Sequence, residues 1–436
     1  MARENSWYQG LSDRVASEAD FIVREFRGRG IEIGGVPDIT AGEAVNDEGS
    51  AKYPQGIGFM YAEDQFLARE KYTRQIQAVA RRRGVRAVTG KRVIGDIVLV
   101  KLAPDNDGEN DERQSLVLDI LSDIDKTLGA GIATPDHLVT VAGELSPCPA
   151  TEPQEVYGPV APYPAVCPGD GGTGVRIFIG DTGMLPGSAE SHAWLNGVLG
   201  QDDTRTETNG TLKHYAGHGT FVAGVVRCMA PKAEIYVANI FDTAGSALES
   251  EFVPKLNAAF SFSFEILHLT IASPTRNNRP LIALDAWLEL LRPYKGVVCV
   301  VAAGNNGNRR PCWPAALPGV ISVGALASDW RSRAYFSNYG GWVDVYAPGQ
   351  NLVNAFGTGD YTCQIAPYTG EHRKFWGMAQ WSGTSFSTPI VTGLIAARMS
   401  ERGENAREAA AALLAKARAQ AIPGLGAVLL PDCSAD

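Results

Sequence analysis

The sequence has no long hydrophobic run and no recognisable export signal. No stretch approaches the roughly 18 uninterrupted apolar residues that a membrane-spanning helix needs, so we expect no membrane span and no membrane partner. The first residues, MARENSWYQGLSDRV, contain neither an apolar core nor a small-residue cleavage site. From these two absences we expect a cytoplasmic location.

Cysteine is scarce, and its spacing argues against the common zinc motifs. The chain has seven cysteines, and none of them form a CxxC pair, so no metal site is predicted. Without an export signal, reduced thiols are the expectation. A disulfide between Cys148 and Cys167, or between Cys312 and Cys363, is left open for export by some other route.

Basic charge is not concentrated anywhere in the chain. The net charge is −9, and no basic run is present. Because nucleic acids are bound by clustered lysine and arginine, we expect no nucleic-acid partner. The 436 residues, of which 45% are apolar, suit a globular protein of two or three domains.

The first part of the chain predicts a small α+β domain behind an N-terminal helix. Residues 11–26 place apolar side chains at spacings of three and four, which is typical of an amphipathic helix. From residue 55 to 142 the patterns follow the order β-α-β-β-α-β, which is that of a ferredoxin-like unit. We therefore assign an N-terminal helix and loop to residues 1–54 and a ferredoxin-like domain to residues 55–143. No candidate catalytic residue lies in either.

The second part of the chain predicts a larger α/β domain. Residues 144–174 are rich in proline and glycine and are assigned as a linker. From residue 175, apolar runs without polar alternation are interleaved with helical patterns, which predicts a parallel sheet with helices on both faces. We assign residues 175–422 to this domain and residues 423–436 to a C-terminal tail. Ligands of such sheets bind beyond the carboxyl ends of the strands.

One serine stands at the predicted start of a buried helix. The stretch WSGTSFSTPIVTG, residues 381–393, places Ser385 after a Gly-Thr turn and before an apolar helical run. Pro389 fits the first helical turn, where a missing N–H costs nothing. The backbone N–H groups at this end of a helix favour an oxygen that develops negative charge. The alternative is a serine that only caps a core helix.

Three more polar residues follow or precede predicted buried elements. Asp181 directly follows the apolar run VRIFIG, His218 precedes the helical run in GHGTFVAGV, and Asn305 directly follows the apolar run VVCVVAAG. Alone, they could be a turn aspartate, a helix-capping histidine and a Gly-Asn turn. An aspartic protease would need a second D-[ST]-G, and none is present. Together with Ser385 they supply an orienting acid, a base, an oxyanion donor and a nucleophile.

The motifs DTG, HGTxVAG, AAGN and GTSxSTP, in this order, resemble those of the subtilisin-like serine proteases (peptidase S8) over roughly residues 173–400. The resemblance implies that Asp181 orients the imidazole, that His218 is the general base and acid, and that Ser385 is the nucleophile. It also implies that Asn305 donates to the oxyanion. The expected reaction is hydrolysis of peptide bonds through an acyl-enzyme.

The resemblance also implies where a peptide substrate binds. The segment EILHLTIASP stands where the family has a glycine-containing wall of the first specificity pocket, and Ala272 there favours a small pocket. The substrate backbone is expected to pair with an edge strand at Gly245 and Ser246. The predicted substrate-binding residues are Gly245, Ser246, Thr270, Ala272, Ala303 and Gly304.

No cofactor is predicted. The connection after the His218 helix is short where secreted relatives often hold calcium, so no tight calcium site is expected at that place. Calcium binding elsewhere is left open without a specific site. Residues 357–380 form a longer connection than the family usually has before the nucleophile. They are expected either to wall one side of the cleft or to be a packed surface loop.

The sequence leaves two candidate functions. The first is a serine endopeptidase whose N-terminal domain, like a family propeptide, is its intramolecular inhibitory partner. The alternative is a partner-sensing regulatory protein whose protease domain is latent until a factor binds.

Overall fold

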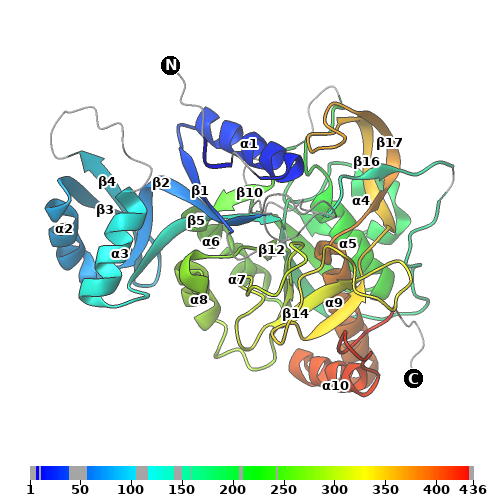
Figure 1. The fold of residues 1–436 in the computed structure, drawn as a ribbon. Helices are drawn as coiled ribbons and strands as arrows, with labels where there is room; N and C mark the ends of the chain where they lie inside the picture. The colour runs from blue at the N-terminus through cyan, green and yellow to red at the C-terminus, as the bar shows by residue number, and fades with distance from the viewer. Residues whose placement is uncertain are drawn as a thin grey trace.

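The computed structural model describes residues 6–8, 11–38, 56–104, 116–141, 150–158, 160–205, 210–241 and 244–431. We call residues 57–141 the N-terminal domain and residues 150–431 the C-terminal domain; both names refer to their described parts. Figure 1 shows the two domains side by side, with one N-terminal helix lying above their junction. None of the helices in the described ranges is long and apolar enough to cross a membrane.

A parallel sheet forms the centre of the C-terminal domain, as the apolar runs predict. Its order is β15-β14-β13-β11-β7-β9-β8, and every pairing within it is parallel. Its strands are β7 (Arg176–Asp181), β8 (Leu199–Gly200), β9 (Glu234–Asn239), β11 (Ile266–Leu269), β13 (Val298–Ala302), β14 (Ile321–Leu326) and β15 (Val345–Pro348).

Helices cover both faces of this sheet, so the predicted fold class is confirmed. On one face lie α5 (His218–Met229), α9 (Thr384–Arg402) and α10 (Ala406–Ala419), and on the other α6 (Glu249–Lys255), α7 (Ala258–Phe262) and α8 (Ile282–Glu289). The alternation of side chains along β7 explains the two cores. Ile177 and Ile179 join the core with α5 and α9, whereas Phe178 joins the core with α6 and α8.

The N-terminal domain has the element order β-α-β-β-α-β that the sequence predicts for a ferredoxin-like unit. The elements are β2 (Ile57–Arg69), α2 (Thr73–Arg82), β3 (Val85–Ile94), β4 (Ile97–Pro104), α3 (Leu116–Leu128) and β5 (Ala133–Val141). The strands pair in the order β5-β2-β4-β3. Ile76 of α2 and Ile120 of α3 are fully buried in one core with the strands.

Strand β5 continues out of its own domain and into the other. Its last residues pair antiparallel with two short strands of the C-terminal domain, β10 (Ser246–Leu248) and β12 (Ile271–Ala272). One seven-stranded sheet therefore runs through both domains. The patterns in the sequence do not indicate this pairing.

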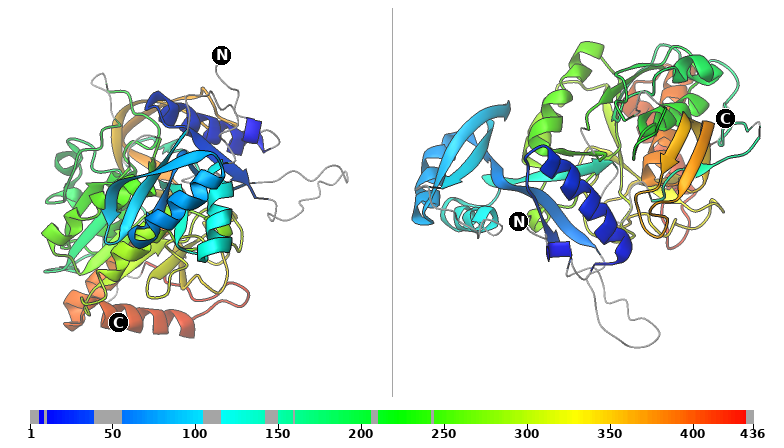
Figure 2. Two further views of the ribbon diagram at one scale, coloured as in Figure 1. Left: turned by 90° about the vertical axis from the view of Figure 1, so that its left-hand side faces the viewer. Right: turned by 90° about the horizontal axis from the view of Figure 1, so that it is seen from above.

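The N-terminal helix α1 (Asp13–Gly28) and strand β1 (Ile33–Pro37) complete the fold. Strand β1 pairs antiparallel with β2, and α1 crosses above β5 and β10, as the view from above in Figure 2 shows. The predicted helix at residues 11–26 is thus present, two residues further along the chain.

The described part of the predicted linker packs against the rest of the C-terminal domain. Within it, β6 (Gln154–Glu155) pairs with β17 (His372–Trp381), which in turn pairs with β16 (Leu352–Thr362). The predicted long connection at residues 357–380 therefore consists mostly of a β-hairpin and the turn that joins its strands. Its inner aromatic side chains, among them Phe375, are fully buried.

The two disulfides that the sequence left open have different outcomes. Cys167 is disulfide-bonded, whereas Cys312 and Cys363 carry thiols. Cys148 lies outside the described residues. The expectation of reduced thiols is therefore wrong for Cys167, and the pairing of Cys312 with Cys363 does not form.

Candidate active site

Asp181 is the last residue of β7, at the carboxyl end of the central sheet. Its carboxylate is fully buried and held by two donors besides the histidine described next. The Thr182 backbone N–H donates to Oδ1 at 2.6 Å, and the Thr270 hydroxyl donates to Oδ2 at 2.5 Å. These bonds fix the plane of the carboxylate.

His218 is the first residue of α5, and its ring faces Asp181. Nδ1 lies 2.8 Å from Asp181 Oδ1 and 3.0 Å from Oδ2. Because the carboxylate can only accept, Nδ1 carries the proton and Nε2 of the neutral ring is an acceptor. The next residue, Gly219, allows this approach, since a Cβ there would lie 2.4 Å from the Gly183 carbonyl oxygen.

The Asp181 carboxyl group is kept ionised by its neighbours. Burial alone would raise its pKa. The electrostatic interaction and hydrogen bond with His218, together with the bonds from Thr270 and Thr182, outweigh burial and lower the pKa of Asp181 below its usual range. An ionised carboxylate is therefore present beside the imidazole at neutral pH.

Ser385 lies in the first turn of α9, fully buried. Its Oγ and the Nε2 atom of His218 have no hydrogen-bond partner among the described residues. The ring of Phe386, next to Ser385, lies 5.1 Å from the His218 ring. Helices α5 and α9 approach closely because Gly393 has no side chain, and a Cβ there would lie 2.5 Å from the Met229 Cβ. The base and the nucleophile thus come from two helices packed directly together.

Asn305 is tied to the residue before Ser385. Its Oδ1 accepts from the Thr384 backbone N–H at 2.8 Å and from the Thr384 hydroxyl at 2.9 Å. With the amide oxygen fixed in this way, the amide NH₂ is the end that can serve as a donor to another group. The Ser385 backbone N–H, in the first turn of α9, is a second donor of the same kind.

Three of the predicted substrate-binding residues lie along β5. Gly245 accepts a bond from the Val141 backbone N–H at 3.0 Å, and Ser246 stands opposite Thr140 in the β10 pairing. Ala272 stands opposite Thr140 on the other side. The end of the N-terminal domain therefore occupies the groove between β10 and β12 as an added strand.

The other three predicted substrate-binding residues are close by but differ in role. The Thr270 hydroxyl is turned toward Asp181, as described above. Ala303 accepts at its carbonyl from the Asn338 side-chain amide at 2.9 Å. Gly304 has φ +95°, and a Cβ there would lie 3.5 Å from the Ala272 Cβ. Ala272 and Gly304 thus approach one another, as a narrow pocket would require.

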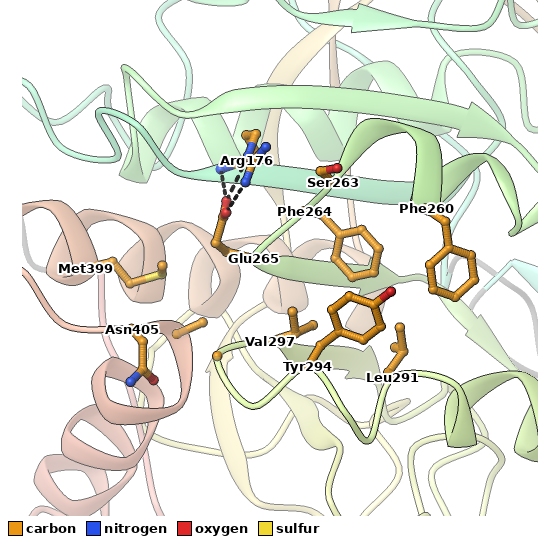
Figure 3. Close-up of a pocket in the computed structure, with 12 residues that line it drawn as sticks. Arg176, Phe260, Ser263, Phe264, Glu265, Leu291, Tyr294, Val297, Met399 and Asn405 are labelled. Atoms are coloured by element: carbon orange, nitrogen blue, oxygen red, sulfur yellow. Dashed lines mark hydrogen bonds and ion pairs between the residues drawn. The ribbon is translucent and has the colours of Figure 1, made fainter.

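A cavity of about 440 Å³ lies away from these residues, at the amino ends of the central strands. Figure 3 shows its aromatic lining, including Phe264 and Tyr294, beside the ion pair of Arg176 and Glu265. Since Asp181 ends β7 and Arg176 begins it, this cavity is at the opposite edge of the sheet from Ser385. Cavity size therefore does not identify the reactive site in this molecule.

Some positioning contacts at the site were not predicted from the sequence. The sequence predicts substrate binding for Thr270 and no role for Thr384, whereas in the structure Thr270 bonds to Asp181 and Thr384 bonds to Asn305. The Gly-Thr-Ser triplet, in which Thr384 directly precedes Ser385, is the sequence pattern that could have indicated a positioning role for Thr384. Among the described residues, no group of three or more His, Cys, Asp or Glu side chains is placed to hold a metal ion.

Comparison with known proteins agrees with this geometry. The profile of the Subtilase family matches residues 172–426, which is more than half of the chain. The chain belongs to this family. Subtilisin NAT of Bacillus subtilis subsp. natto is 28% identical over 243 residues, which cover 53% of this chain and 56% of that protein. Thermitase of Thermoactinomyces vulgaris is 30% identical over 254 residues, covering 56% of this chain and 80% of that one.

Solved structures of subtilisin-like proteins are also similar, at lower identity. A cold adapted subtilisin-like serine proteinase has a TM-score of 0.43 and 21% identity, covering 61% of this chain and 90% of its own. The patellamide maturation protease PatA has a TM-score of 0.44 and 24% identity, covering 58% and 88%. The chain spans only about half the length of Subtilisin NAT.

Proposed function

We propose that this subtilase is a serine endopeptidase that works through Asp181, His218 and Ser385, and that its N-terminal domain restrains it. The observation that carries the proposal is the contact of His218 Nδ1 with the ionised Asp181 carboxylate at 2.8 Å. It leaves Nε2 as an acceptor toward the helix that bears Ser385. Family membership supports the same reaction.

In the proposed reaction, Ser385 Oγ attacks the peptide carbonyl while His218 Nε2 accepts the hydroxyl proton. Asp181 holds the ring and stabilises the imidazolium that forms. The imidazolium then protonates the leaving amine, and a water molecule hydrolyses the acyl-enzyme by the same route in reverse. The Asn305 NH₂ and the Ser385 backbone N–H stabilise the oxyanion.

The restraint by the N-terminal domain rests on strand β5. A peptide bound to a sheet edge adds a strand, with backbone bonds for affinity and side-chain pockets for specificity. Strand β5 does this on β10 and β12, so a substrate could not pair there at the same time. The comparisons give no support to the alternative of a partner-sensing regulatory protein.

The oxyanion role can be tested at Asn305. Asn305→Ala is expected to lower kcat by about 10²–10³-fold with little change in KM, because the lost donor acts mainly in the transition state. Steady-state kinetics on a fluorogenic peptide would measure this. Asn306→Ala is the matched control, since Asn306 is the next residue and bonds to Asn338 instead. Unchanged turnover in Asn305→Ala would remove Asn305 from the mechanism.

The restraint predicts a processing event. If the enzyme cuts its own chain, N-terminal sequencing of purified protein should give a new start between residues 142 and 150. Strand β5 runs into the groove just before these residues, and β6 holds the chain on β17 soon after them. The new start should be absent from a Ser385→Ala preparation. A start inside residues 1–130 in the active protein would contradict the prediction.

A further inference from the structure

The N-terminal helix α1 contacts both domains at their junction. Its apolar face, with Val15, Ala19 and Ile22, shares one core with β2, with Leu138 of β5 and with Leu248 of β10. All five of these side chains are buried. The helix therefore holds β5 against β10 from above, in the arrangement that Figure 2 shows.

A second face of α1 bonds directly to the C-terminal domain. The Tyr215 hydroxyl donates to Glu18 Oε1 at 2.8 Å, and both side chains are buried. The Phe21 ring lies edge-on to the ring of His214, with centroids 5.2 Å apart. Since Tyr215 lies three residues before His218, the helix is anchored on the loop that leads into α5.

Two further bonds extend this anchor toward the linker and the hairpin. The Ala366 backbone N–H, in the turn between β16 and β17, donates to Ser17 Oγ at 3.2 Å. The Arg14 guanidinium donates to the Ala150 carbonyl oxygen at 2.6 Å. Helix α1 thus contacts the chain at Leu138, before residues 142–149, and at Ala150, after them.

We propose that α1 and β1, residues 11–38, are a latch that keeps β5 in the groove even after the chain is cut between residues 141 and 150. Such a cut separates β5 from the linker covalently. The latch still joins them, because it contacts Leu138 on one side of the cut and Ala150 and Tyr215 on the other. Access to the groove then requires the displacement of α1. This inference rests on the proposed function.

The interactions on the second face of α1 suit a latch that can be released. We call this face, with Ser17, Glu18 and Phe21, the anchoring face. It binds the C-terminal domain through two hydrogen bonds and one ring pair. Removal of these interactions weakens a complex while Val15, Ala19 and Ile22 stay in the core with β2. The bonds of Ser17 and Glu18 can be removed without touching that core, whereas Phe21→Ala also trims its edge, because Phe21 packs against it.

The test uses the full chain with a recognition sequence for a site-specific cysteine protease inserted between Val141 and Ala150. After folding and cutting, release of the N-terminal piece on dilution is followed by size-exclusion chromatography. Exposure of Ser385 is followed by its rate of fluorophosphonate labelling. The variants are Ser17→Ala/Glu18→Ala/Phe21→Ala and the matched control Arg24→Ala, whose side chain is exposed on the same helix and pairs with Asp20.

The cut protein and Arg24→Ala should retain the piece and label slowly. The triple variant should release it about 30-fold faster or more, because two hydrogen bonds and one aromatic ring pair are removed together. Tyr215→Phe, which removes one bond from the other side, should accelerate release about 5-fold. If the triple variant does not fold, Tyr215→Phe tests the latch instead.

Two outcomes separate the latch from the proposed function. The latch would be overturned if the cut parent protein, the triple variant and Tyr215→Phe all released the N-terminal piece at the same rate, whatever the labelling. Faster release without any labelling of Ser385 would leave the latch standing and would instead refute the peptidase proposal.

Discussion

Ser385→Ala is expected to lower peptide turnover by about 10⁵–10⁶-fold, the loss seen when the nucleophile of a triad of this kind is removed. The residual rate should come from the oxyanion donors and from substrate binding alone. The measurement is kcat on a fluorogenic peptide, with parent and variant both cut at a protease recognition sequence inserted between Val141 and Ala150 and both freed of the N-terminal piece. Fluorophosphonate labelling should disappear at the same time.

The variant should remain as stable as the parent. The Ser385 hydroxyl is buried with no hydrogen-bond partner among the described residues, so its removal relieves the cost of an unpaired polar group. We expect the free energy of unfolding to stay level or to rise by about 1 kcal/mol. Loss of activity with unchanged or higher stability would exclude misfolding as the cause.

Ser387→Ala is the matched control for this prediction. Ser387 lies two residues further along the same buried turn, and its hydroxyl donates to the Thr384 carbonyl oxygen at 3.0 Å. It should keep its labelling and most of its turnover. If Ser385→Ala were labelled as fast as the parent, or if Ser387→Ala lost labelling instead, the nucleophile would be wrongly assigned.

The reactive residues could be predicted because each belongs to a local pattern. Asp181 ends an apolar strand, His218 begins a helix of small residues, and Ser385 follows a Gly-Thr turn. In a parallel sheet, strand ends of one direction gather at one edge. Short stretches of sequence thus determine where these side chains meet, although they did not reveal that Thr270 would bond to Asp181.

The docking of the N-terminal part could not be predicted in the same way. The sequence predicts β5 only as the final strand of its domain, and nothing local sets its register on β10 and β12. Glu18 and Tyr215 bond across 197 positions of sequence. The amphipathic pattern of α1 showed that one face would be buried but not against what. Such partners follow from tertiary packing, to which sequence periodicity is blind.

The burial of the Glu18 carboxyl group illustrates the limit. In the sequence it is one acidic residue in a helical pattern, with a spacing that suits the apolar face as well as the polar one. Its full burial is tolerated through the tyrosine of another domain, because a buried carboxyl group needs hydrogen bonds. A pattern within one helix cannot contain that partner.

Asp181→Asn is expected to lower kcat by about 10³–10⁴-fold while leaving KM nearly unchanged. The amide carries no charge, so it cannot stabilise the imidazolium that forms when His218 accepts the Ser385 proton. Thr182 N–H and the Thr270 hydroxyl donate to the two different carboxylate oxygens. An asparagine can accept only one of these bonds, and the side chain loses part of its support as well.

The same variant should change the response of stability to acid. Because the pKa of Asp181 is lower in the folded protein than in the unfolded chain, its ionised form contributes stability above the unfolded value of about 3.9. That contribution is lost as the pH falls through the folded value. Unfolding free energies measured from pH 6 downward should therefore fall less steeply for Asp181→Asn than for the parent.

Asp344→Asn supplies the comparison for both measurements. Asp344 lies just before β15, where its carboxylate accepts from the Ser322 backbone N–H at 2.9 Å, away from the carboxyl end of β7. This variant should keep its kcat within about two-fold, since it does not touch the reacting groups. An equal loss of kcat in the two variants would mean that Asp181 acts through general stability. A loss confined to Asp181→Asn, with the altered acid response, would place its charge in the reaction.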